Sequence, residues 1–367
     1  MAAHGLPPLS GAAWDSETDD RLTCVAVFPE THDTKTFVFR APEGRRFVFA
    51  PGQFLTFGFE IAGEVLNRCY SLASSPLRPG TASITVKRVP GGTVSGWLHA
   101  EMRPGTTVRA LGPMGAFTAA RHPSPKYLFL SGGSGITPLM SMSRAYADLA
   151  LPVDIVFLHA ARSPLDLVFR AELDLIARRL DGFRLIHLPE RRDGGAEWPG
   201  AVGRISVPLL RCLVPDAADR VVFCCGPDPF MAAARGVCAA LGVPASNHHQ
   251  ESFDVSTLQA EEPAVAMDAE IAEREIETAS PAFTVTFARS DRTIQVGAGQ
   301  FILATARDRG VTLPSSCRTG LCGTCKSKLL SGTVDMQHRG GIRQREIAAG
   351  LFLPCCSKPL SDLVVDR

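Results

Sequence analysis

The sequence lacks three features that would place it in other classes of protein. No charge of one sign dominates, because 38 Lys and Arg face 37 Asp and Glu, and a net charge of +1 gives no basic stripe for nucleic acid. No apolar run approaches the roughly 18 residues of a membrane helix. No basic segment followed by an apolar core opens the chain, which argues against a secretory signal. We therefore expect a cytoplasmic protein without nucleic-acid or membrane partners.

Export-type disulfides are also not expected, although the chain has 11 cysteines. Five of them fall between Cys317 and Cys356. In a long chain without an export signal, such a cluster indicates a metal site more readily than a disulfide framework. At about 100–200 residues per domain, a chain of 367 residues is expected to form two to three domains.

The first 122 residues predict an all-β domain behind a short arm. Residues 1–20 are small, Pro-rich and polar, and we expect a mobile N-terminal arm. Residues 21–122 contain short runs of β-branched and aromatic residues separated by Pro, Gly and charge, which is typical of an antiparallel β-barrel. One helix, at about 94–102, interrupts these runs.

The rest of the chain divides into an α/β domain, a linker and a small α+β domain. Strands alternate with helices over 123–254, which predicts a parallel α/β sheet. Residues 255–281 are rich in Ala and Glu and predict an acidic linker. From 282 to 367 we expect a hairpin, a helix, the Cys-rich loop and a closing strand.

The cysteine cluster has a specific spacing. Cys317-x4-Cys322-x2-Cys325 is followed by Cys355 after 29 residues, which is the plant-type [2Fe–2S] pattern. Three thiolates in one loop and a fourth from a distant segment would surround the cluster. A structural zinc site is the alternative, but zinc sites favour pairs of C-x2-C spacings.

Two features of this region bear on the ligand set. Gly320 and Gly323 would let the loop turn sharply and direct amide N–H groups at sulfur. Residues 282–367 resemble plant-type ferredoxins, which have a β-grasp fold. In that family the last ligand stands four residues before a Pro, as Cys355 stands before Pro359. Either Cys355 or Cys356 could be the fourth ligand by position; the resemblance implies Cys355, with Cys356 in the core or next to the ligands.

Two motifs in the β-domain suit a flavin. Arg68-Cys69-Tyr70-Ser71 offers a guanidinium for a phosphate, a ring to cover the isoalloxazine and a hydroxyl for its N5, although the same four residues would also suit an ordinary surface strand. The second motif lies between Lys87 and Ser95, where a strand ends and a helix begins. Its glycines and the helix N-terminus suit a pyrophosphate. Its candidate residues are Lys87, Gly91, Gly92, Thr93 and Ser95, and Ser95 could also cap the helix.

These motifs resemble the R-x-Y-S and G-x-x-S motifs of the ferredoxin–NADP reductase superfamily, and Pro51-Gly52-Gln53 resembles its P-G-Q strand start. The resemblance implies FAD, with FMN as the less favoured alternative.

The α/β domain carries two further motifs of that superfamily. The turn from Ser131 to Pro138 follows a strand and opens a helix, and it resembles G-x-G-x-T-P. The residues predicted to bind the NAD(P) pyrophosphate there are Gly133, Gly135, Thr137 and Pro138. Cys225-Gly226-Pro227 resembles the C-G-P turn at the nicotinamide, and Glu251-Ser252-Phe253 closes the domain as in the family. Phe253 is expected to shield the flavin until nicotinamide arrives.

The resemblance implies that Tyr70, Ser71 and Cys225 take part in the hydride transfer. The choice between NADH and NADPH rests on conflicting signals, since Arg162 suits a 2′-phosphate, Asp166 suits a ribose diol, and Glu190 is followed by two arginines. We favour NADH by analogy with similar oxygenase reductases.

Three cofactor modules in this order imply an electron-transfer reductase that passes electrons from NAD(P)H to FAD, then to [2Fe–2S] and finally to a protein partner. The domain order resembles reductase components of Rieske-type monooxygenases that demethylate glycine betaine or stachydrine. Hybrid-cluster-protein reductases are close relatives and give the first alternative. The second alternative is a redox sensor whose flavin and cluster report state without turnover.

Overall fold

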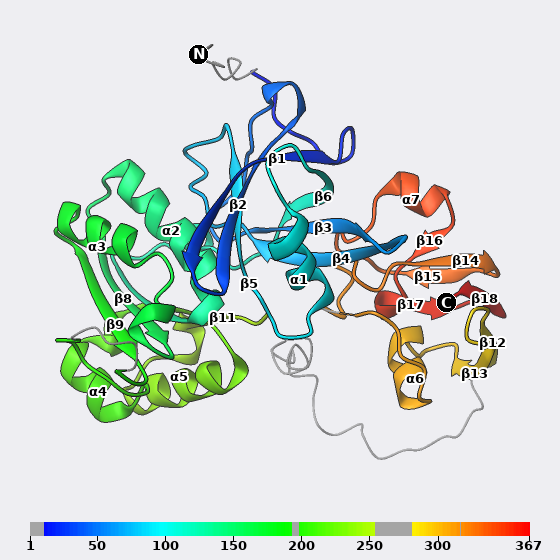
Figure 1. The fold of residues 1–367 in the computed structure, drawn as a ribbon. Helices are drawn as coiled ribbons and strands as arrows, with labels where there is room; N and C mark the ends of the chain where they lie inside the picture. Colours follow the sequence, from blue (N-terminus) through cyan, green and yellow to red (C-terminus); the bar gives the residue numbers. More distant parts are fainter. Residues whose placement is uncertain (1–10, 193–197, 254–280, 316) are drawn as a thin grey trace, which may run out of the picture. The chain divides into compact units, whose positions relative to one another are not determined.

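The computed structural model describes residues 11–192, 198–253, 281–315 and 317–367. The chain forms two compact units, Met1–Phe253 and Asp254–Arg367, and each is described by itself (Figure 1). The predicted linker over 255–281 lies outside the described residues except for Pro281. Among the helices of the described parts, none is both long and apolar enough to cross a membrane.

The first unit begins with a six-stranded antiparallel sheet in the order β4-β3-β6-β1-β2-β5 (Figure 1). The sheet curls so that its two edge strands, β4 and β5, approach each other. Leu72, just after β4, forms an isolated bridge with Ile84 of β5, and the Ala73 amide donates to Ser83 O at 2.8 Å. Helix α1 (Thr93–Glu101) follows β5 within one residue of its predicted position. The strands are β1 (Arg21–Thr31), β2 (Thr34–Arg40), β3 (Phe54–Ile61), β4 (Glu64–Ser71), β5 (Ala82–Lys87) and β6 (Thr107–Met114).

Aromatic side chains fill the barrel, as the period-2 pattern of its strands predicts. Phe37 and Phe39 of β2 and Phe57 and Phe59 of β3 are completely buried. Each pair is separated by one residue, so both members point to the same face of their strand. Burial of such rings stabilises the barrel by roughly 2–3 kcal/mol each.

Residues 11–20 of the N-terminal arm predicted over residues 1–20 pack against the barrel. Trp14 is only 5% exposed, its ring centroid lies 5.5 Å from that of Phe47, and its amide donates to Arg46 O at 2.8 Å. The Trp14 indole N–H also donates to Asp19 O at 2.8 Å. One large aromatic residue in a polar segment therefore anchors that segment to the barrel core, which composition alone did not reveal. Residues 1–10 lie outside the described residues.

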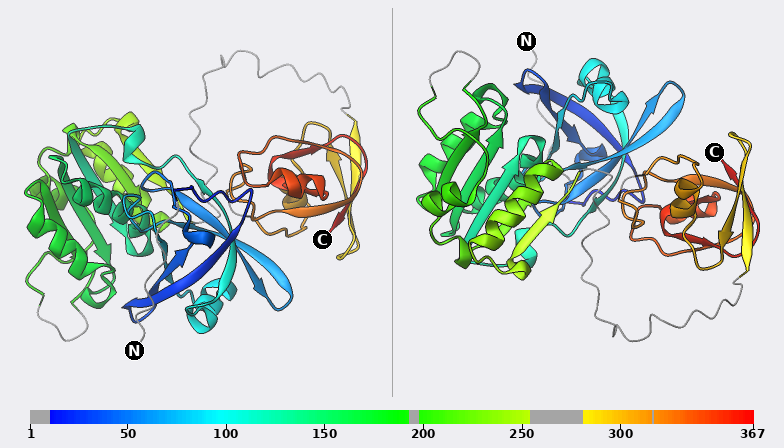
Figure 2. Two further views of the ribbon diagram at one scale, coloured as in Figure 1. Left: turned by 90° about the horizontal axis from the view of Figure 1, so that it is seen from above. Right: turned by 90° about the horizontal axis from the view of Figure 1, so that it is seen from below.

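The second half of this unit is a parallel sheet in the order β11-β10-β7-β8-β9, with helices on both faces (Figures 1 and 2). The strands are β7 (Lys126–Gly132), β8 (Asp154–Ala161), β9 (Phe183–Pro189), β10 (Val221–Cys225) and β11 (His248–Glu251). The helices are α2 (Ile136–Leu149), α3 (Arg170–Arg179), α4 (Val207–Leu213) and α5 (Asp228–Ala240). The short helix α4 was not predicted.

Alternate residues of these strands belong to two separate cores. Phe129, Phe157 and Cys225 pack with α2 and α3 on one face, whereas their neighbours Leu130 and Cys224 pack with α4 and α5 on the other. Both faces are covered, which explains why the strands read as continuous apolar runs without polar alternation.

Helix α2 fixes the parallel sheet to the barrel. The Arg144 guanidinium donates from Nη1 to Ala73 O at 2.6 Å and forms a two-pronged ion pair with Glu172 of α3 at 2.6 and 2.8 Å. It also lies 4.8 Å from the ring centroid of Phe169. Ser141 Oγ donates to Ser74 O at 2.7 Å. One largely buried cation therefore connects the barrel loop, α2 and α3.

The second unit has a mixed five-stranded sheet in the order β13-β12-β18-β14-β16 and a two-stranded sheet β15-β17. Strand β18 pairs parallel to β12, and the other pairs are antiparallel. Together with the barrel and the parallel layer, this confirms the predicted fold class. The strands are β12 (Ala282–Phe287), β13 (Arg292–Gly297), β14 (Ser327–Ser331), β15 (Val334–Met336), β16 (Leu351–Phe352), β17 (Ser357–Pro359) and β18 (Leu363–Asp366), and the helices are α6 (Ile302–Asp308) and α7 (Gln344–Ala348).

Replacement of Arg144 should weaken the first unit strongly. We expect Arg144→Ala to lower the free energy of unfolding by about 3 kcal/mol, because Ala73 O and Glu172 lose a buried, charged donor. Arg144→Lys should recover only part of this, since an ammonium cannot form the two-pronged pair. Urea unfolding of the purified protein measures both, with Arg178→Ala on the exposed face of α3 as the matched control. Equal stability of Arg144→Ala and the control would contradict this role.

Candidate functional site

The four cysteines predicted to bind iron meet in two pairs in the second unit. The side chain of Cys317 lies beside that of Cys322, because each Sγ accepts from the amide of the other residue, and the side chain of Cys325 lies beside that of Cys355. Hydrogen bonds from Cys325 and Cys356 lower the pKa of the Cys355 thiol, whereas the partnered Cys317 and Cys325 have raised pKa values. Two pairs of thiols fit a cluster of two irons in which each iron takes two cysteines.

The backbone of the cysteine loop provides the amide donors that such a cluster requires. The amides of Leu321 and Cys322 donate to Cys317 Sγ at 3.3 and 3.1 Å, and the Cys317 amide donates to Cys322 Sγ at 3.3 Å. Gly320 and Gly323 have φ of +75° and +68°. A Cβ at Gly323 would lie 2.4 Å from Gly341 O, so the loop requires both the positive φ and the missing side chain.

The geometry favours Cys355 over Cys356 as the fourth ligand. Cys355 lies beside Cys325, whereas Cys356 Sγ points back toward Leu353 O at 3.6 Å. A Cβ at Gly320 would lie 2.7 Å from Cys356 Sγ, so Cys356 packs against the back of the loop. Cys355 remains our prediction for the ligand and Cys356 for the core residue.

The two flavin motifs lie on the same part of the barrel. The ring centroid of Phe59 is 6.3 Å from that of Tyr70 on β4 and 5.7 Å from that of Trp97 on α1. Arg68 is exposed on β4, and its Nη1 donates to Asn67 O at 2.7 Å. Burial raises the pKa of the Tyr70 hydroxyl, which is therefore neutral at physiological pH. Tyr70 and the α1 residue Trp97 thus pack on the same phenyl ring, and the phosphate-binding roles of Arg68 and of the helix N-terminus stay predictions.

The turn before α1 is shaped for a close backbone approach. Gly91 has φ of +72°, and Gly92 is the N-cap of α1, where a Cβ would lie 2.6 Å from Ser95 Oγ. Ser95 does not cap the helix. It stands in the first turn, just after Thr93, and its Oγ accepts from the Val89 amide at 3.1 Å, which holds the turn closed.

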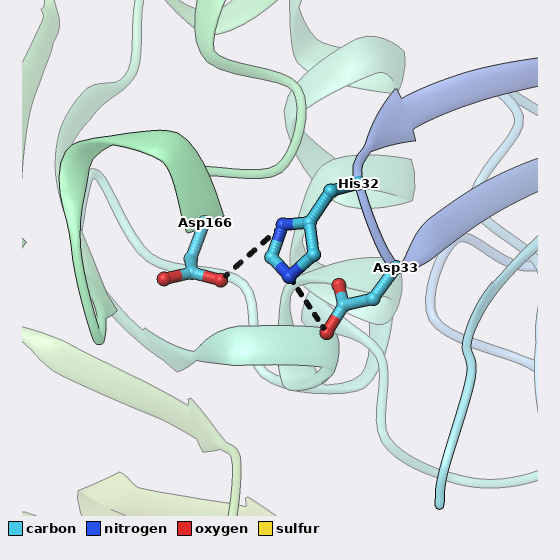
Figure 3. Close-up of side chains that lie close together, drawn as sticks. All are labelled: His32, Asp33 and Asp166. Carbon is cyan, nitrogen blue, oxygen red and sulfur yellow. Dashed lines mark ion pairs between the residues drawn. The ribbon is translucent and has the colours of Figure 1, made fainter. Parts of the chain in front are cut away.

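Lys87, also predicted at the pyrophosphate, is paired with Asp33 in the turn between β1 and β2, at 3.0 Å between Nζ and Oδ2. Figure 3 shows the His32 ring between the carboxylates of Asp33 and Asp166, at 3.7 and 4.0 Å. The three side chains could in principle hold a metal ion, but the Lys87 ammonium lies at the same Asp33 oxygen and opposes a second cation.

The carboxylates proposed for NADH selectivity are already engaged. Ser163 Oγ donates to Asp166 Oδ2 at 2.7 Å, and Glu190 pairs with Arg204 at 3.1 Å. Arg162 is exposed. The preference for NADH therefore stays a prediction.

The two nicotinamide motifs are in direct backbone contact. Gly133 has φ of +53°, and a Cβ at Gly135 would lie 2.3 Å from Cys225 O. A Cβ at Gly226 would lie 3.0 Å from the Gly132 amide nitrogen. The turn after β7 therefore packs on the end of β10, and glycine is required on both sides of this contact.

The flanking residues complete this region. Thr137 and Pro138 are buried in the first turn of α2, Pro227 is the N-cap of α5, and Phe253 is 45% exposed at the end of the described segment.

Sequence reasoning did not select Glu251, although it stands at the end of a strand in the closing Glu-Ser-Phe. Glu251 pairs with Cys225 in the β10–β11 register, and Ser71 Oγ donates to its Oε2 at 3.4 Å. Burial raises the pKa of the Glu251 carboxyl to about 8. Burial also raises the pKa of Cys225, with a further contribution from Glu251. A barrel hydroxyl, a half-buried acid and a buried thiol thus meet where the barrel faces the parallel sheet.

Comparison with protein families gives three matches along the chain. Residues 23–119 match an oxidoreductase FAD-binding domain, 129–236 an oxidoreductase NAD-binding domain and 285–360 a 2Fe-2S iron-sulfur cluster binding domain. These matches confirm the predicted FAD, NAD(P)H and 2Fe-2S cofactors and decide against zinc. They also confirm an NAD(P)H-dependent flavin and iron–sulfur oxidoreductase.

Individual proteins are similar over the whole length. The glycine betaine monooxygenase reductase subunit of Pseudomonas aeruginosa strain UCBPP-PA14 is 40% identical over 366 residues, covering 100% of both chains. The stachydrine N-demethylase reductase subunit of Rhizobium meliloti strain 1021 is 39% identical, covering 94% of this chain and 96% of its own. The solved structure of phthalate dioxygenase reductase, described as modular for electron transfer from pyridine nucleotides to [2Fe-2S], aligns with a TM-score of 0.55 and 25% identity over 95% of this chain and 97% of its own.

The Glu251 carboxyl should make the stability of the first unit depend on pH. Its pKa is about 8 in the folded protein against an ordinary 4.5, so between these values the folded state holds a proton that the unfolded state has lost. This contribution is complete below about pH 4.5 and is lost as the pH rises through 8, with a slope approaching about 1.4 kcal/mol per pH unit.

Urea unfolding across this pH range measures that slope. Glu251→Gln should flatten it, whereas Glu190→Gln, at an exposed ion pair, should not. The assignment fails if the slope of Glu251→Gln equals that of the unmodified protein.

Proposed function

The chain belongs to the family of ferredoxin–NADP-reductase-like FAD and NAD-binding reductases with a C-terminal 2Fe-2S ferredoxin domain, and we propose that it is the reductase component of a Rieske-type oxygenase system. NAD(P)H supplies two electrons as a hydride and an iron–sulfur cluster transfers one, while a flavin can exchange electrons in either number. The observation that carries the proposal is the presence of all three cofactor domains in one chain, with similarity to oxygenase reductases over the full length.

The residues of the first unit would position the two ring systems. We assign the dinucleotide to the glycine turn at 133–135 and the turn at Cys225, which pack directly on each other. Tyr70 and Ser71 stand at the barrel edge that faces this turn, and Ser71 holds Glu251. We assign the hydride-transfer region to Tyr70, Ser71 and Cys225, with the half-buried Glu251 carboxyl, whose pKa is raised, beside them.

The organic substrate of the partner is proposed from the relatives. One relative is named for glycine betaine and another for stachydrine, and both compounds are quaternary ammonium acids. We therefore propose that the partner is a demethylase of a quaternary ammonium compound. The test mixes this protein, NADH and candidate Rieske-type oxygenases with each compound and measures formaldehyde release. Brisk NADH oxidation without formaldehyde in every combination would reject this partner while leaving the reductase assignment intact.

Removal of one cluster ligand should separate the two halves of the reaction. We expect Cys322→Ser to reduce electron transfer to cytochrome c at least about 100-fold, because one ligand to the cluster is lost. Reduction of the bound flavin by NAD(P)H should stay within about twofold, because Cys322 lies in the other unit. Stopped-flow absorbance measures both rates.

Cys212→Ser, at an exposed cysteine of α4, provides the matched control and should change neither rate. Equal loss of flavin reduction and cytochrome reduction in Cys322→Ser would contradict the separation of roles.

A further inference from the structure

A short segment of the second unit contacts both stretches of chain that carry the predicted cluster ligands. It comprises residues 336–341, which begin at the last residue of β15, and we call it the strap. On one side the amides of Arg339 and Gly341 both donate to Gly320 O in the cysteine loop at 3.0 Å. A Cβ at Gly320 would lie 3.0 Å from His338 Cα, so the strap crosses this loop in close backbone contact.

On its other side the strap holds the turn that carries Cys355. The Gln337 amide donates to Cys356 O at 2.9 Å, and Met336 Sδ accepts from the Leu353 amide at 3.3 Å. Leu353 is the N-cap of the short 3-10 helix that contains Cys355. The strap therefore connects the loop with three predicted ligands to the turn with the fourth.

The Met336 contact is a side-chain bond to a buried amide. Leu353 is completely buried, and its carbonyl oxygen accepts from the Cys356 amide at 3.1 Å and from Ser357 Oγ at 2.8 Å. These two bonds hold the turn from within, whereas the Met336 thioether holds it from the strap. A buried amide that loses its acceptor destabilises the conformation that buries it, although a thioether is only a weak acceptor.

Packing alone does not require a sulfur at this position. The Met336 side chain is half-buried, and with Val334, Ile347 and Leu351 it lines a cavity of about 350 Å³. A leucine would fill the same space against the same apolar neighbours. The hydrogen bond to the Leu353 amide is what a leucine does not supply.

We propose that Met336 is a positioning residue for the 2Fe-2S cluster, because its thioether fixes the Leu353 amide and thereby the place of Cys355. The inference rests on the proposed function, since it takes Cys355 as the fourth ligand of the cluster that passes electrons on. A cluster whose ligands come from two segments loses iron when one segment moves away from the other. The strap opposes this movement, and Met336 is its side-chain link to the turn.

Iron release from the oxidised holoprotein tests this role without turnover. EDTA in excess withdraws iron from the cluster, and the iron left on the protein is measured after gel filtration at successive times. We expect Met336→Leu to release iron at least about threefold faster than the unmodified protein, because the residues around metal ligands govern how well the metal is retained. Met336→Gln, whose side-chain oxygen can accept from the Leu353 amide, should release iron within about twofold of the unmodified rate.

A second substitution in the same cavity provides the matched control. Ile347 also lines this cavity, and Ile347→Leu keeps the volume of its side chain, so this variant should release iron at the unmodified rate. Should Met336→Leu purify without iron, the yield of reconstitution with ferrous iron and sulfide replaces the release rate as the readout. Met336→Gln should then again match the unmodified protein.

The outcomes separate the two proposals. Equal release rates for Met336→Leu and the unmodified protein would overturn the role of Met336. A Met336→Gln or an Ile347→Leu variant that loses iron as fast as Met336→Leu would overturn it as well, because the hydrogen bond would then not be the cause. An unmodified protein that holds neither iron nor acid-labile sulfide, even after reconstitution, would instead reject the proposed reductase function.

Discussion

The contact between helix α2 and the barrel is the constraint on which the flavin and nicotinamide regions depend. Arg144 connects the barrel loop at Ala73 with α2 and α3, so the two sheets form one unit. At the same boundary Ser71, the last residue of the edge strand β4, donates to Glu251 of the parallel sheet. The hydride-transfer region that we propose therefore takes its residues from both the barrel and the parallel sheet.

The second unit brings four cysteine side chains together, and all four are free thiols. Glycines at 320 and 323 allow a turn that places amide N–H groups on sulfur, and Gly341 lets the neighbouring loop approach without a clash. Amide donors stabilise thiolate charge and thereby help to set the reduction potential of a cluster.

Much of this could be predicted from sequence because the motifs are local. The spacing of Cys317, Cys322 and Cys325 and the glycine turn at 133–135 identify their chemistry over a few residues. Contacts between distant segments could not be predicted in this way. The burial of Trp14, the pairing of Lys87 with Asp33 and the acid at Glu251 all depend on tertiary neighbours that no local pattern specifies.

The central claim is that one chain takes electron pairs from NAD(P)H and passes single electrons to its cluster, and an anaerobic titration with NADH tests it most directly. Full reduction of the holoprotein should require about 1.5 equivalents, since flavin and cluster together hold three electrons. The electron paramagnetic resonance signal of a reduced [2Fe–2S] cluster should grow with the added NADH. Complete bleaching of the flavin at one equivalent, with a cluster that stays oxidised however much NADH is added, would contradict the account.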